Sequence, residues 1–390
     1  MLPLQDKLQV YHFHNGSGGG ILSVIKNLIS FSDNSKIENH IIYTINKDLQ
    51  NEFKIEKVEK AITEQIYYYS SKNNFYYTCN QLAKLLPNED ALIIAHDWME
   101  LGMVSNLGLQ NRVVHYVHGD YEYYYNLAFK NASIIDSFIT VSKSIKNNLI
   151  KKIVHRINDI SYLRFPVQNV ESLEKSTKFG NKIVFVGRCE PAKGYFLLPQ
   201  IATKLNAYSK NFEWHIIGEE SKNKKDELIW PNNVKVKFYG SIDNKKVLEL
   251  LSNMDFFLLP SISEGMPVSL IEAMKSGVIP FVNNWGEAVF ELIEVDKTGF
   301  IIKDNDVDEF VREIVSISNN ESKMNEMRQL AIEKANNLFN PQKNVQAIEA
   351  LFLTIEKNSK NNANKKYGSR LDQPWIPNFI TKTIRSFLNG

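Results

Sequence analysis

Two glutamates at the start of a predicted helix are the residues best suited to bind a sugar. Glu264 and Glu272 are separated by seven residues and follow the apolar run Phe256–Leu259. Pro267 favours the first turn of a helix, and Gly277 favours its end. We therefore expect Glu264 in the loop before the helix and Glu272 within it. Carboxylates accept hydrogen bonds from vicinal hydroxyls, which are the groups that sugars and ribose offer.

The start of the same predicted helix is suited to an anion. The backbone N–H groups of Gly265, Met266 and Val268 are expected there, where free donors and the helix dipole stabilise negative charge. A diphosphate at this point would leave one carboxylate near a sugar and the other near a ribose. The alternative is an ordinary helix entry with Glu272 exposed to solvent.

A second segment offers two cations after a predicted strand. Ile183–Val186 is apolar and runs into a turn at Gly187, after which Arg188 and Lys193 follow. Arginine can donate two hydrogen bonds at once to phosphate oxygens, and lysine adds a compact positive charge. Together they would neutralise the charge that develops on a departing nucleoside diphosphate. Surface cations in a loop are the alternative interpretation for either residue.

A glycine-rich turn lies near the amino end. Residues 14–20 follow the predicted strand Leu8–Phe13 and open a helix, and Gly18 and Gly19 would let the backbone approach a ligand closely. A dinucleotide-binding fingerprint does not fit, because its third glycine would fall on Ile21. A tight turn without a ligand is the other interpretation.

Two series of short apolar runs, separated by helical patterns, are expected to position these residues. Near-continuous apolarity is typical of strands covered on both faces, as in a parallel sheet flanked by helices. The runs of the first series are Leu8–Phe13, His40–Ile45, Ile66–Tyr69, Ala91–Ala95, Arg112–Val117 and Ser137–Val141. Those of the second are Ile183–Val186, Trp214–Ile217, Val234–Phe238, Phe256–Leu259, Val278–Val282 and Phe300–Ile302.

The fold class is therefore α/β, with two Rossmann-like domains. We expect the first domain at residues 1–168 and the second at 181–356, joined by the polar stretch 168–182. Such sheets bind ligands at the carboxyl ends of their strands, and two in tandem would face each other across a cleft. Residues 357–390 are expected to form a polar linker and a terminal amphipathic helix.

The terminal helix has an apolar face. Six apolar side chains recur at helical spacing between positions 376 and 388, with Lys382 and Arg385 elsewhere on the helix. The aromatic content favours docking of this face onto the first domain. Contact with an anionic membrane is the alternative.

Composition excludes several classes of protein. The 390 residues carry 46 basic and 44 acidic side chains, so the net charge of +2 does not favour binding to nucleic acid. The two cysteines, Cys79 and Cys189, have no metal-binding spacing and suit a reducing compartment. The N-terminus lacks the pattern of a signal peptide, and no apolar stretch suits a membrane span. A cytoplasmic location is expected, with peripheral contact to the inner face of the membrane as the other possibility.

The segments around Arg188 and Glu264 resemble the donor domain of the family 4 glycosyltransferases, which have the GT-B fold and a pair of glutamates seven residues apart. The resemblance covers most of residues 181–305 and follows the family's order of motifs. Its further elements are Trp214–Glu219, Phe238–Gly240, Asn253–Ser261, Gly286–Ile293 and Thr298–Phe300. In the first half, the glycine turn, His96-Asp97-Trp98 and the strand ending at His118 are also similar to family elements.

The resemblance implies roles for these residues. Glu264 would contact the hydroxyls of the donor sugar and Glu272 the ribose, while Arg188 and Lys193 would bind the diphosphate. His118 would help to position the donor sugar or the acceptor, although a lone histidine is more often structural. His96 or Asp97 would lie near the acceptor side, with a structural role equally open. The terminal helix would cross back to the first domain.

The implied activity is transfer of a sugar, with retention at the anomeric carbon and without a metal or cofactor. The donor would be a UDP- or GDP-sugar. A glycan or lipid-linked glycan would be the acceptor, most often in bacterial cell-surface polysaccharide biosynthesis. Two alternatives remain open at this point. One is a non-catalytic subunit that binds a nucleotide sugar or glycan, and the other is a nucleotide-sugar epimerase or a pyridoxal-dependent phosphorylase of the same fold.

Overall fold

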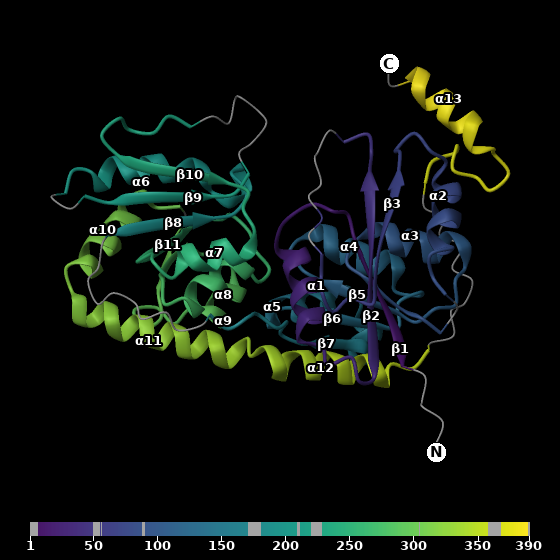
Figure 1. Ribbon diagram of the computed structural model, residues 1–390, viewed down its shortest axis with the longest axis horizontal. Coiled ribbons are helices and arrows are strands. Elements are labelled where there is room, and N and C mark those ends of the chain that lie inside the picture. The colour runs from purple at the N-terminus through teal and green to yellow at the C-terminus, as the bar shows by residue number, and fades with distance from the viewer. Residues whose placement is uncertain are drawn as a thin grey trace. The chain divides into compact units, whose positions relative to one another are not determined.

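The chain forms two α/β units, each built on one parallel sheet (Figure 1). The computed structural model describes residues 7–49, 55, 57–87, 90–170, 181–208, 211–219, 228–303, 305–357 and 368–388. Unit 1 comprises Met1–Phe165 and Gln342–Gly390, and unit 2 comprises Pro166–Pro341. The predicted linkers fall largely outside the described residues, at 171–180 and 358–367.

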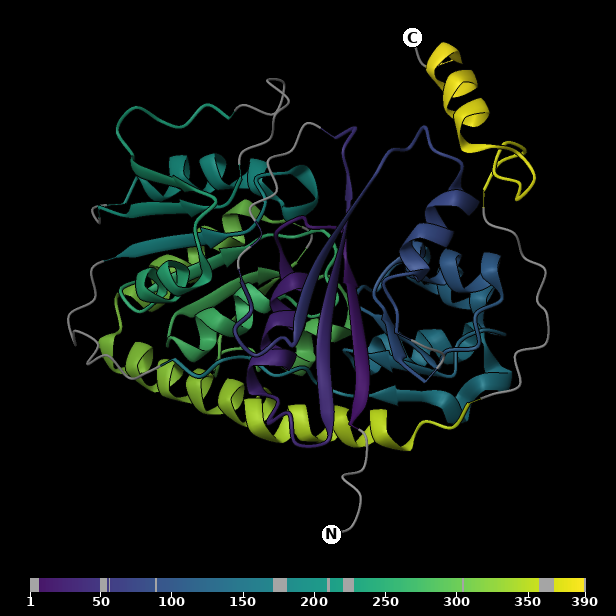
Figure 2. The same cartoon turned by 45° about the vertical axis from the view of Figure 1, so that its right-hand side comes forward.

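Unit 1 contains a seven-stranded sheet in the order β3-β2-β1-β4-β5-β6-β7. Every neighbouring pair in it is parallel. The strands are β1 Leu8–His14, β2 Ile37–Asn46, β3 Thr63–Tyr69, β4 Leu92–Ala95, β5 Val113–Val117, β6 Ser137–Thr140 and β7 Ile160–Tyr162. The order reverses between β1 and β4, which is where an open α/β sheet has its ligand crevice. Figure 2 shows β1, β2 and β3 running side by side.

The helices of unit 1 come from both ends of the chain. They are α1 Gly20–Phe31, α2 Phe75–Ala83, α3 Trp98–Leu107, α4 Glu122–Asn131, α5 Lys143–Lys152, α12 Pro341–Thr354 and α13 Asn378–Leu388. On α12, Asn344 donates a hydrogen bond to the carbonyl of Phe165, 3.2 Å away, and Glu349 accepts one from Ser32. The chain thus returns to the first unit, as predicted. The predicted boundary at 356 was wrong, because α12 packs with unit 1 and not with unit 2.

Unit 2 contains a six-stranded sheet in the order β10-β9-β8-β11-β12-β13, again parallel throughout. Its strands are β8 Lys182–Val186, β9 Glu213–Ile217, β10 Lys235–Gly240, β11 Phe256–Leu259, β12 Ile279–Asn283 and β13 Phe300–Ile302. Its α-helices are α6 Leu198–Leu205, α7 Asn244–Leu251, α8 Val268–Lys275, α9 Glu287–Leu292, α10 Val307–Ser318 and α11 Glu321–Leu338. Two Rossmann-like domains are thereby confirmed.

The centre of the second sheet is apolar because its strands are covered on both faces. All four residues of β11 are buried, as are all five of β12. Strand β11 pairs with β8, so Phe256 lies beside Ile183. The carboxyl ends of these two strands therefore open at the same edge of the sheet, and the loops that follow them emerge next to each other.

A buried ion pair fixes the start of β11 to α11. Arg328 donates to Asp255 over 2.6 Å, and both side chains are almost fully buried. The second carboxylate oxygen of Asp255 accepts a hydrogen bond from the backbone N–H of Lys182, at the start of β8. One carboxylate therefore ties together the two strands that lead to the candidate site.

Replacing Arg328 with leucine should lower the free energy of unfolding by about 3–5 kcal/mol, because the charge of Asp255 would stay buried without its partner. A urea titration followed by circular dichroism measures the loss. Arg312→Leu is the matched control, since the Arg312 side chain is 61% exposed where it pairs with Glu309 and Glu313. The control should change stability by less than about 1 kcal/mol. Equal stability of the two variants would contradict this role for Arg328.

Candidate functional site

The carboxyl edge of the second sheet brings together two loops that are distant in sequence. The loop after β8 carries Gly187, Arg188 and Lys193, and the loop after β11 carries Glu264. The Nζ atom of Lys193 lies 2.6 Å from Oε1 of Glu264. The sequence predicted both residues for the donor site but assigned them to separate parts of the ligand. The structure shows that they form one ion pair.

The carboxylate of Glu264 is held from two sides. Besides Lys193, the hydroxyl of Ser261 donates to Oε1 of Glu264 over 2.7 Å. The Glu264 side chain is only 8% exposed, whereas that of Lys193 is 24% exposed. Lysine has three donors, so one can hold Glu264 while the others face a ligand. Ser261 was missed from sequence, because nothing in its spacing distinguishes it from other loop serines.

Close backbone packing between the loops requires two glycines. Gly194 has a φ of +65°, and a Cβ atom there would lie 1.8 Å from the carbonyl oxygen of Pro260. Gly218, at the end of β9, has a φ of +146°, and its Cβ would lie 1.8 Å from the carbonyl oxygen of Gly187. No side chain fits at either position. The backbone N–H of Ile262 adds a hydrogen bond to the carbonyl of Ala192, 3.0 Å long.

Helix α8 begins at Val268, so Glu264 lies in the loop before it, as predicted. Pro267 is its N-cap residue, one position before the predicted first turn, and Gly277 follows its end with a φ of +65°. Gly265, Met266 and Val268 are buried at this start. The first N–H groups of an α-helix have no intrahelical acceptor, so this end of α8 presents donors and the positive end of the dipole.

Glu272 lies inside α8 and is buried, so the alternative of a solvent-exposed Glu272 was wrong. Its Oε1 accepts a hydrogen bond from Nδ2 of Asn244, at the start of α7, over 2.8 Å. Burial raises the pKa of Glu272 to about 7, and the hydrogen bond from Asn244 and the charge of Lys275 offset only part of this shift. Asn244 could not be identified from sequence as a partner of Glu272, because the two residues are 28 positions apart in the chain.

Arg188 follows β8 as predicted but does not join the pair of Lys193 and Glu264. Its side chain is 65% exposed and pairs with Glu190 over 3.0 Å. An exposed pair of this kind contributes less than about 1 kcal/mol. Arg188 can therefore exchange Glu190 for a phosphate group at little cost.

In unit 1, the glycine turn opens α1 at the carboxyl end of β1, as expected. Gly19 is the N-cap of α1 with a φ of +128°. A Cβ atom on Gly18 or Gly19 would meet nothing within 4 Å, so the turn borders open space. His14, the last residue of β1, accepts a hydrogen bond at Nδ1 from the backbone N–H of Gly16. This edge has room for a ligand.

Three histidines form a chain beside this turn. Nε2 of His12 contacts Oδ1 of Asn39 at 3.2 Å, and Nδ1 of His12 contacts Nε2 of His96 at 3.4 Å. Nδ1 of His96 then contacts Nε2 of His118 at 2.8 Å. The chain joins β1, β2 and the loops after β4 and β5, and it brings the predicted His118 and His96 together. His12 and Asn39 were missed, because both lie within apolar strands.

The oxygen of Asn39 sets the tautomers along this chain. Burial lowers the pKa of His12 to about 4 and, with His115 and His14 nearby, that of His118 to about 3. The pKa of His96 is also lowered by burial. Each neutral ring has one N–H. Because Asn39 Oδ1 only accepts, His12 donates to Asn39, His96 to His12 and His118 to His96. Nδ1 of His118 is then left as an acceptor for a hydroxyl.

Asp97, the other predicted acceptor-side residue, has a structural contact. Its side chain accepts a hydrogen bond from the N–H of Trp98 and belongs to a capping box with Glu100 at the start of α3. It also accepts a hydrogen bond from the hydroxyl of Tyr123. The structure therefore accounts for Asp97 without a ligand.

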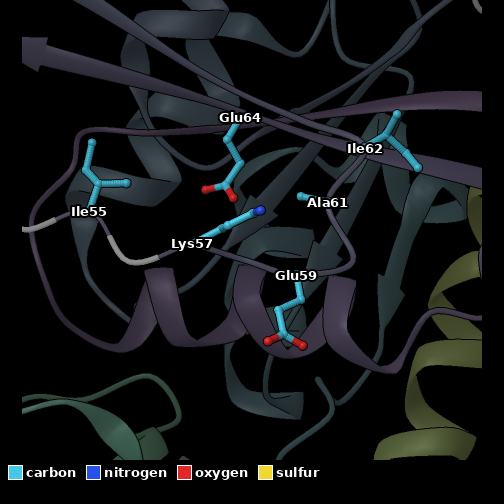
Figure 3. Close-up of a pocket in the computed structure, with 6 residues that line it drawn as sticks. All are labelled: Ile55, Lys57, Glu59, Ala61, Ile62 and Glu64. Atoms are coloured by element: carbon cyan, nitrogen blue, oxygen red, sulfur yellow. The ribbon is translucent and has the colours of Figure 1, made fainter.

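A separate hollow of about 470 Å³ lies in unit 1 (Figure 3). Its lining residues are Ile55, Lys57, Glu59, Ala61, Ile62 and Glu64. Ala61 and Ile62 precede β3, so the hollow lies at the amino end of this strand, opposite the ligand-binding edge.

Among the described residues, no group of three histidine, cysteine, aspartate or glutamate side chains could hold a metal ion. The side chains of Cys79 and Cys189 are both buried.

Two α/β units, each built on a parallel sheet, give this chain the GT-B fold. The family described as "Glycosyl transferases group 1" matches residues 171–338, which include Arg188, Lys193, Glu264 and Glu272. Over this part of its length, the chain is similar to that family.

Curated relatives match over part of their length. The UDP-Gal:alpha-D-GlcNAc-diphosphoundecaprenol alpha-1,3-galactosyltransferase of Escherichia coli is 29% identical over 192 residues, 46% of this chain and 47% of that protein. The poly(ribitol-phosphate) alpha-N-acetylglucosaminyltransferase of Staphylococcus aureus strain COL is 30% identical over 176 residues, 40% of this chain and 34% of that protein. The chain thus spans less than half the length of each.

Solved structures match over nearly the whole chain. HepE of Anabaena, in complex with UDP and glucose, has a TM-score of 0.73 at 15% identity and covers 89% of this chain and 100% of its own. A TarM variant of S. aureus, in complex with UDP, alpha-GlcNAc-glycerol and fondaparinux, has a TM-score of 0.72 at 13% identity, with 88% and 99% covered. Because the sequence identities are this low, the structural similarity establishes the fold and nothing further.

The raised pKa of Glu272 predicts a pH-dependent stability. The native state binds this proton more tightly than the unfolded chain, so the stabilisation is complete below the unfolded pKa of 4.5 and is lost as the pH rises through about 7. Between about pH 5 and about pH 7.5, wild-type protein should lose on the order of 3 kcal/mol relative to Glu272→Gln. Urea titrations at both pH values measure this difference. A Gln variant with the same pH dependence as wild type would contradict the burial of an ionisable Glu272.

Proposed function

We propose that the protein is a retaining glycosyltransferase that moves a sugar from a UDP-sugar to a glycan or lipid-linked glycan in cell-surface polysaccharide biosynthesis. The observation that carries this proposal is the contact of Lys193 with Glu264 beside the start of α8. A cation, a carboxylate and free helix N–H groups meet there at the ligand-binding edge of the sheet. This combination suits a diphosphate joined to a sugar.

Each group has a role that follows from its surroundings. Lys193 and Arg188 bind the diphosphate and absorb the negative charge that develops as the nucleotide leaves. The N–H groups at the start of α8 add donors for the same charge. Glu264, fixed by Ser261 and Lys193, accepts a hydrogen bond from a sugar hydroxyl, and Glu272 does so from the ribose. On unit 1, the free Nδ1 of His118 accepts a hydrogen bond from a sugar hydroxyl.

The same arrangement supports retention without a covalent intermediate. A retaining glycosidase uses a carboxylate as nucleophile with a second carboxyl group about 5 Å away. Glu264 is instead held by a lysine and a serine, and Glu272 by an asparagine. We therefore assign attack by the acceptor hydroxyl on the same face from which UDP leaves, through an oxocarbenium-like state. The bond between the anomeric carbon and the UDP oxygen breaks, the bond to the acceptor oxygen forms, and the hydroxyl proton passes to a phosphate oxygen of the departing UDP. Lys193 and Arg188 supply the charge stabilisation that a metal gives elsewhere.

The donor and the acceptor are assigned from similar proteins. HepE and TarM were solved with UDP, which favours uracil over guanine as the base. The E. coli relative is named for a diphosphoundecaprenol-linked acceptor, and the S. aureus relative for a poly(ribitol-phosphate) acceptor. Both acceptors are intermediates or polymers of the cell surface. Transfer would then take place on the cytoplasmic face of the membrane.

A thermal-shift series with UDP, GDP, ADP, dTDP and CMP tests the donor site. UDP should raise the melting temperature selectively, because a ligand that binds only the native state stabilises it. Lys193→Ala should weaken UDP binding by about ten- to a hundredfold, which corresponds to the loss of a charged hydrogen bond. Arg188→Ala should lower kcat for release of UDP from the UDP-sugar in the presence of acceptor.

Lys204→Ala is the matched control, since Lys204 lies on α6 of the same unit and makes an exposed pair with Asp308. It should bind UDP as wild type does. No shift with any nucleotide at millimolar concentration would contradict the donor site. Selective binding without transfer to any glycan would contradict the assigned reaction and favour a binding subunit.

A further inference from the structure

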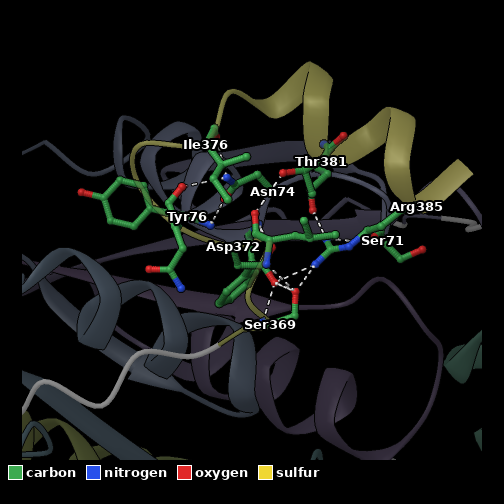
Figure 4. A network of polar contacts seen from close by, with 12 residues as sticks. Ser71, Asn74, Tyr76, Ser369, Asp372, Ile376, Thr381 and Arg385 are labelled. Carbon is green, nitrogen blue, oxygen red and sulfur yellow. Dashed lines mark hydrogen bonds and ion pairs between the residues drawn. The ribbon is translucent and has the colours of Figure 1, made fainter. Parts of the chain in front are cut away.

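Helix α13 docks onto unit 1 through its polar edge (Figure 4). The guanidinium of Arg385 donates to the backbone carbonyls of Asn73 and Ser71 and to the carboxylate of Asp372, which is 2.7 Å away. Thr381, one turn earlier, is fully buried and donates to the carbonyl of Leu371 over 2.9 Å. The helix is therefore attached by hydrogen bonds and an ion pair.

The segment before α13 is fixed in the same way to the start of α2. Asn74, the N-cap residue of α2, donates through Nδ2 to the carbonyls of Gln373 and Ile376, and its own N–H donates to Oδ1 of Asn378. Asp372 accepts the N–H of Phe75 over 2.6 Å. These contacts satisfy backbone groups of both segments, so they determine which side of α13 faces the unit.

This attachment turns the apolar face of α13 outward. Side chains four residues apart share one side of a helix, so Thr381 and Arg385 define the docked side. The apolar side chains on the other side are exposed: Phe379 by 70%, Phe387 by 84% and Leu388 by 75%, with Ile380 and Ile384 more than a third exposed. Docking onto the first domain was predicted correctly, but the predicted packing of aromatic side chains was wrong. Trp375, just before the helix, is also exposed.

The charge of the surrounding chain suits an anionic partner. Residues 357–390 include seven lysines and arginines and one acidic residue, Asp372, whereas the whole chain has a net charge of only +2. On α13 itself, Lys382 is exposed beside the apolar face. A second copy of this chain would bring the same excess of positive charge to the contact, which would repel it. An anionic lipid surface offers both an apolar interior and negative headgroups.

We propose that α13 is a membrane-surface helix, which inserts Phe379, Ile380, Ile384, Phe387 and Leu388 into the headgroup region of an anionic bilayer. Lys382, which is exposed on the same helix, contacts the lipid phosphates. No helix of the described residues is long and apolar enough to cross a membrane. This inference goes beyond the proposed transfer reaction, and it can be measured without any donor or acceptor.

Co-sedimentation of the full chain with lipid vesicles tests the proposal. Wild-type protein should bind vesicles that contain equal parts of phosphatidylcholine and phosphatidylglycerol, and binding should fall as salt rises. Vesicles of phosphatidylcholine alone should bind at least tenfold less protein. The double variant Phe379→Ser/Phe387→Ser should lose at least tenfold in partitioning. Both side chains are exposed, so the variant should fold normally, which circular dichroism verifies.

Phe129→Ser is the matched control, because Phe129 is an exposed aromatic residue of α4 in the same unit. It should bind vesicles as wild type does. A blue shift of fluorescence on adding vesicles, absent in Trp375→Phe, would place the start of α13 at the lipid surface.

Several results would overturn the proposal. One is wild-type protein that does not bind anionic vesicles, and another is a double variant that binds as well as wild type. A dimer in light scattering that the double variant dissociates, without vesicle binding by wild type, would show that a second copy covers the face. The UDP thermal shift should be unchanged in the double variant, since the donor loops belong to unit 2. Failure of the membrane proposal is thereby separated from failure of the proposed function.

Discussion

The contact between Lys193 and Glu264 depends on how closely two loops can approach at one edge of a parallel sheet. Strands β8 and β11 are neighbours, so their loops emerge together, and Gly194 allows the backbone to pass against Pro260 without a side chain between them. A larger residue there would separate the loops and with them the ammonium and the carboxylate. The ion pair thus depends on sheet order, on one backbone conformation and on a buried apolar sheet beneath it.

The buried carboxylates of unit 2 differ in their partners and in the edge of the sheet at which they lie. Asp255 is paired with Arg328 and fastens β8 and β11 at their amino ends, whereas Glu264 and Glu272 lie at the other edge. Burial raises the pKa of Glu272 to about 7, so near neutral pH its carboxyl group accepts hydrogen bonds when ionised and can also donate one when protonated. Helix α13 adds a third constraint near the end of the chain, where polar contacts decide which face of the helix is exposed.

Sequence patterns predicted the local structure well where burial is continuous. The apolar runs became the strands of both sheets, with small shifts in their bounds. Strand β7 was missed because it has only three residues and one of them is Ser161. Helix α12 was placed in the wrong unit, since an amphipathic pattern does not say which core the helix covers. In α13 the pattern indicated a helix, but it could not show that Thr381 and Arg385 would take the docked side.

Several residues of the candidate site were predicted from sequence, but the contacts between them were not. The loops around Arg188 and Glu264 carry recognisable residue types, so their chemistry could be proposed. Their hydrogen-bond partners Ser261, Asn244 and Asn39 could not be predicted. The fold brings each of them to its partner, and no sequence motif links the two. The histidine chain has the same origin, since His12, His96 and His118 come from different strands and loops.

Hydrogen exchange with and without UDP, followed by mass spectrometry, tests the central claim most directly. The claim is that the nucleotide diphosphate binds at the carboxyl edge of the second sheet. UDP should slow exchange in peptides that cover residues 187–194 and 261–272, because their amides line the loops and the start of α8. Peptides that cover 57–64, around the hollow of unit 1, should be unaffected. Protection at 57–64, or none at the two loops, would contradict the account.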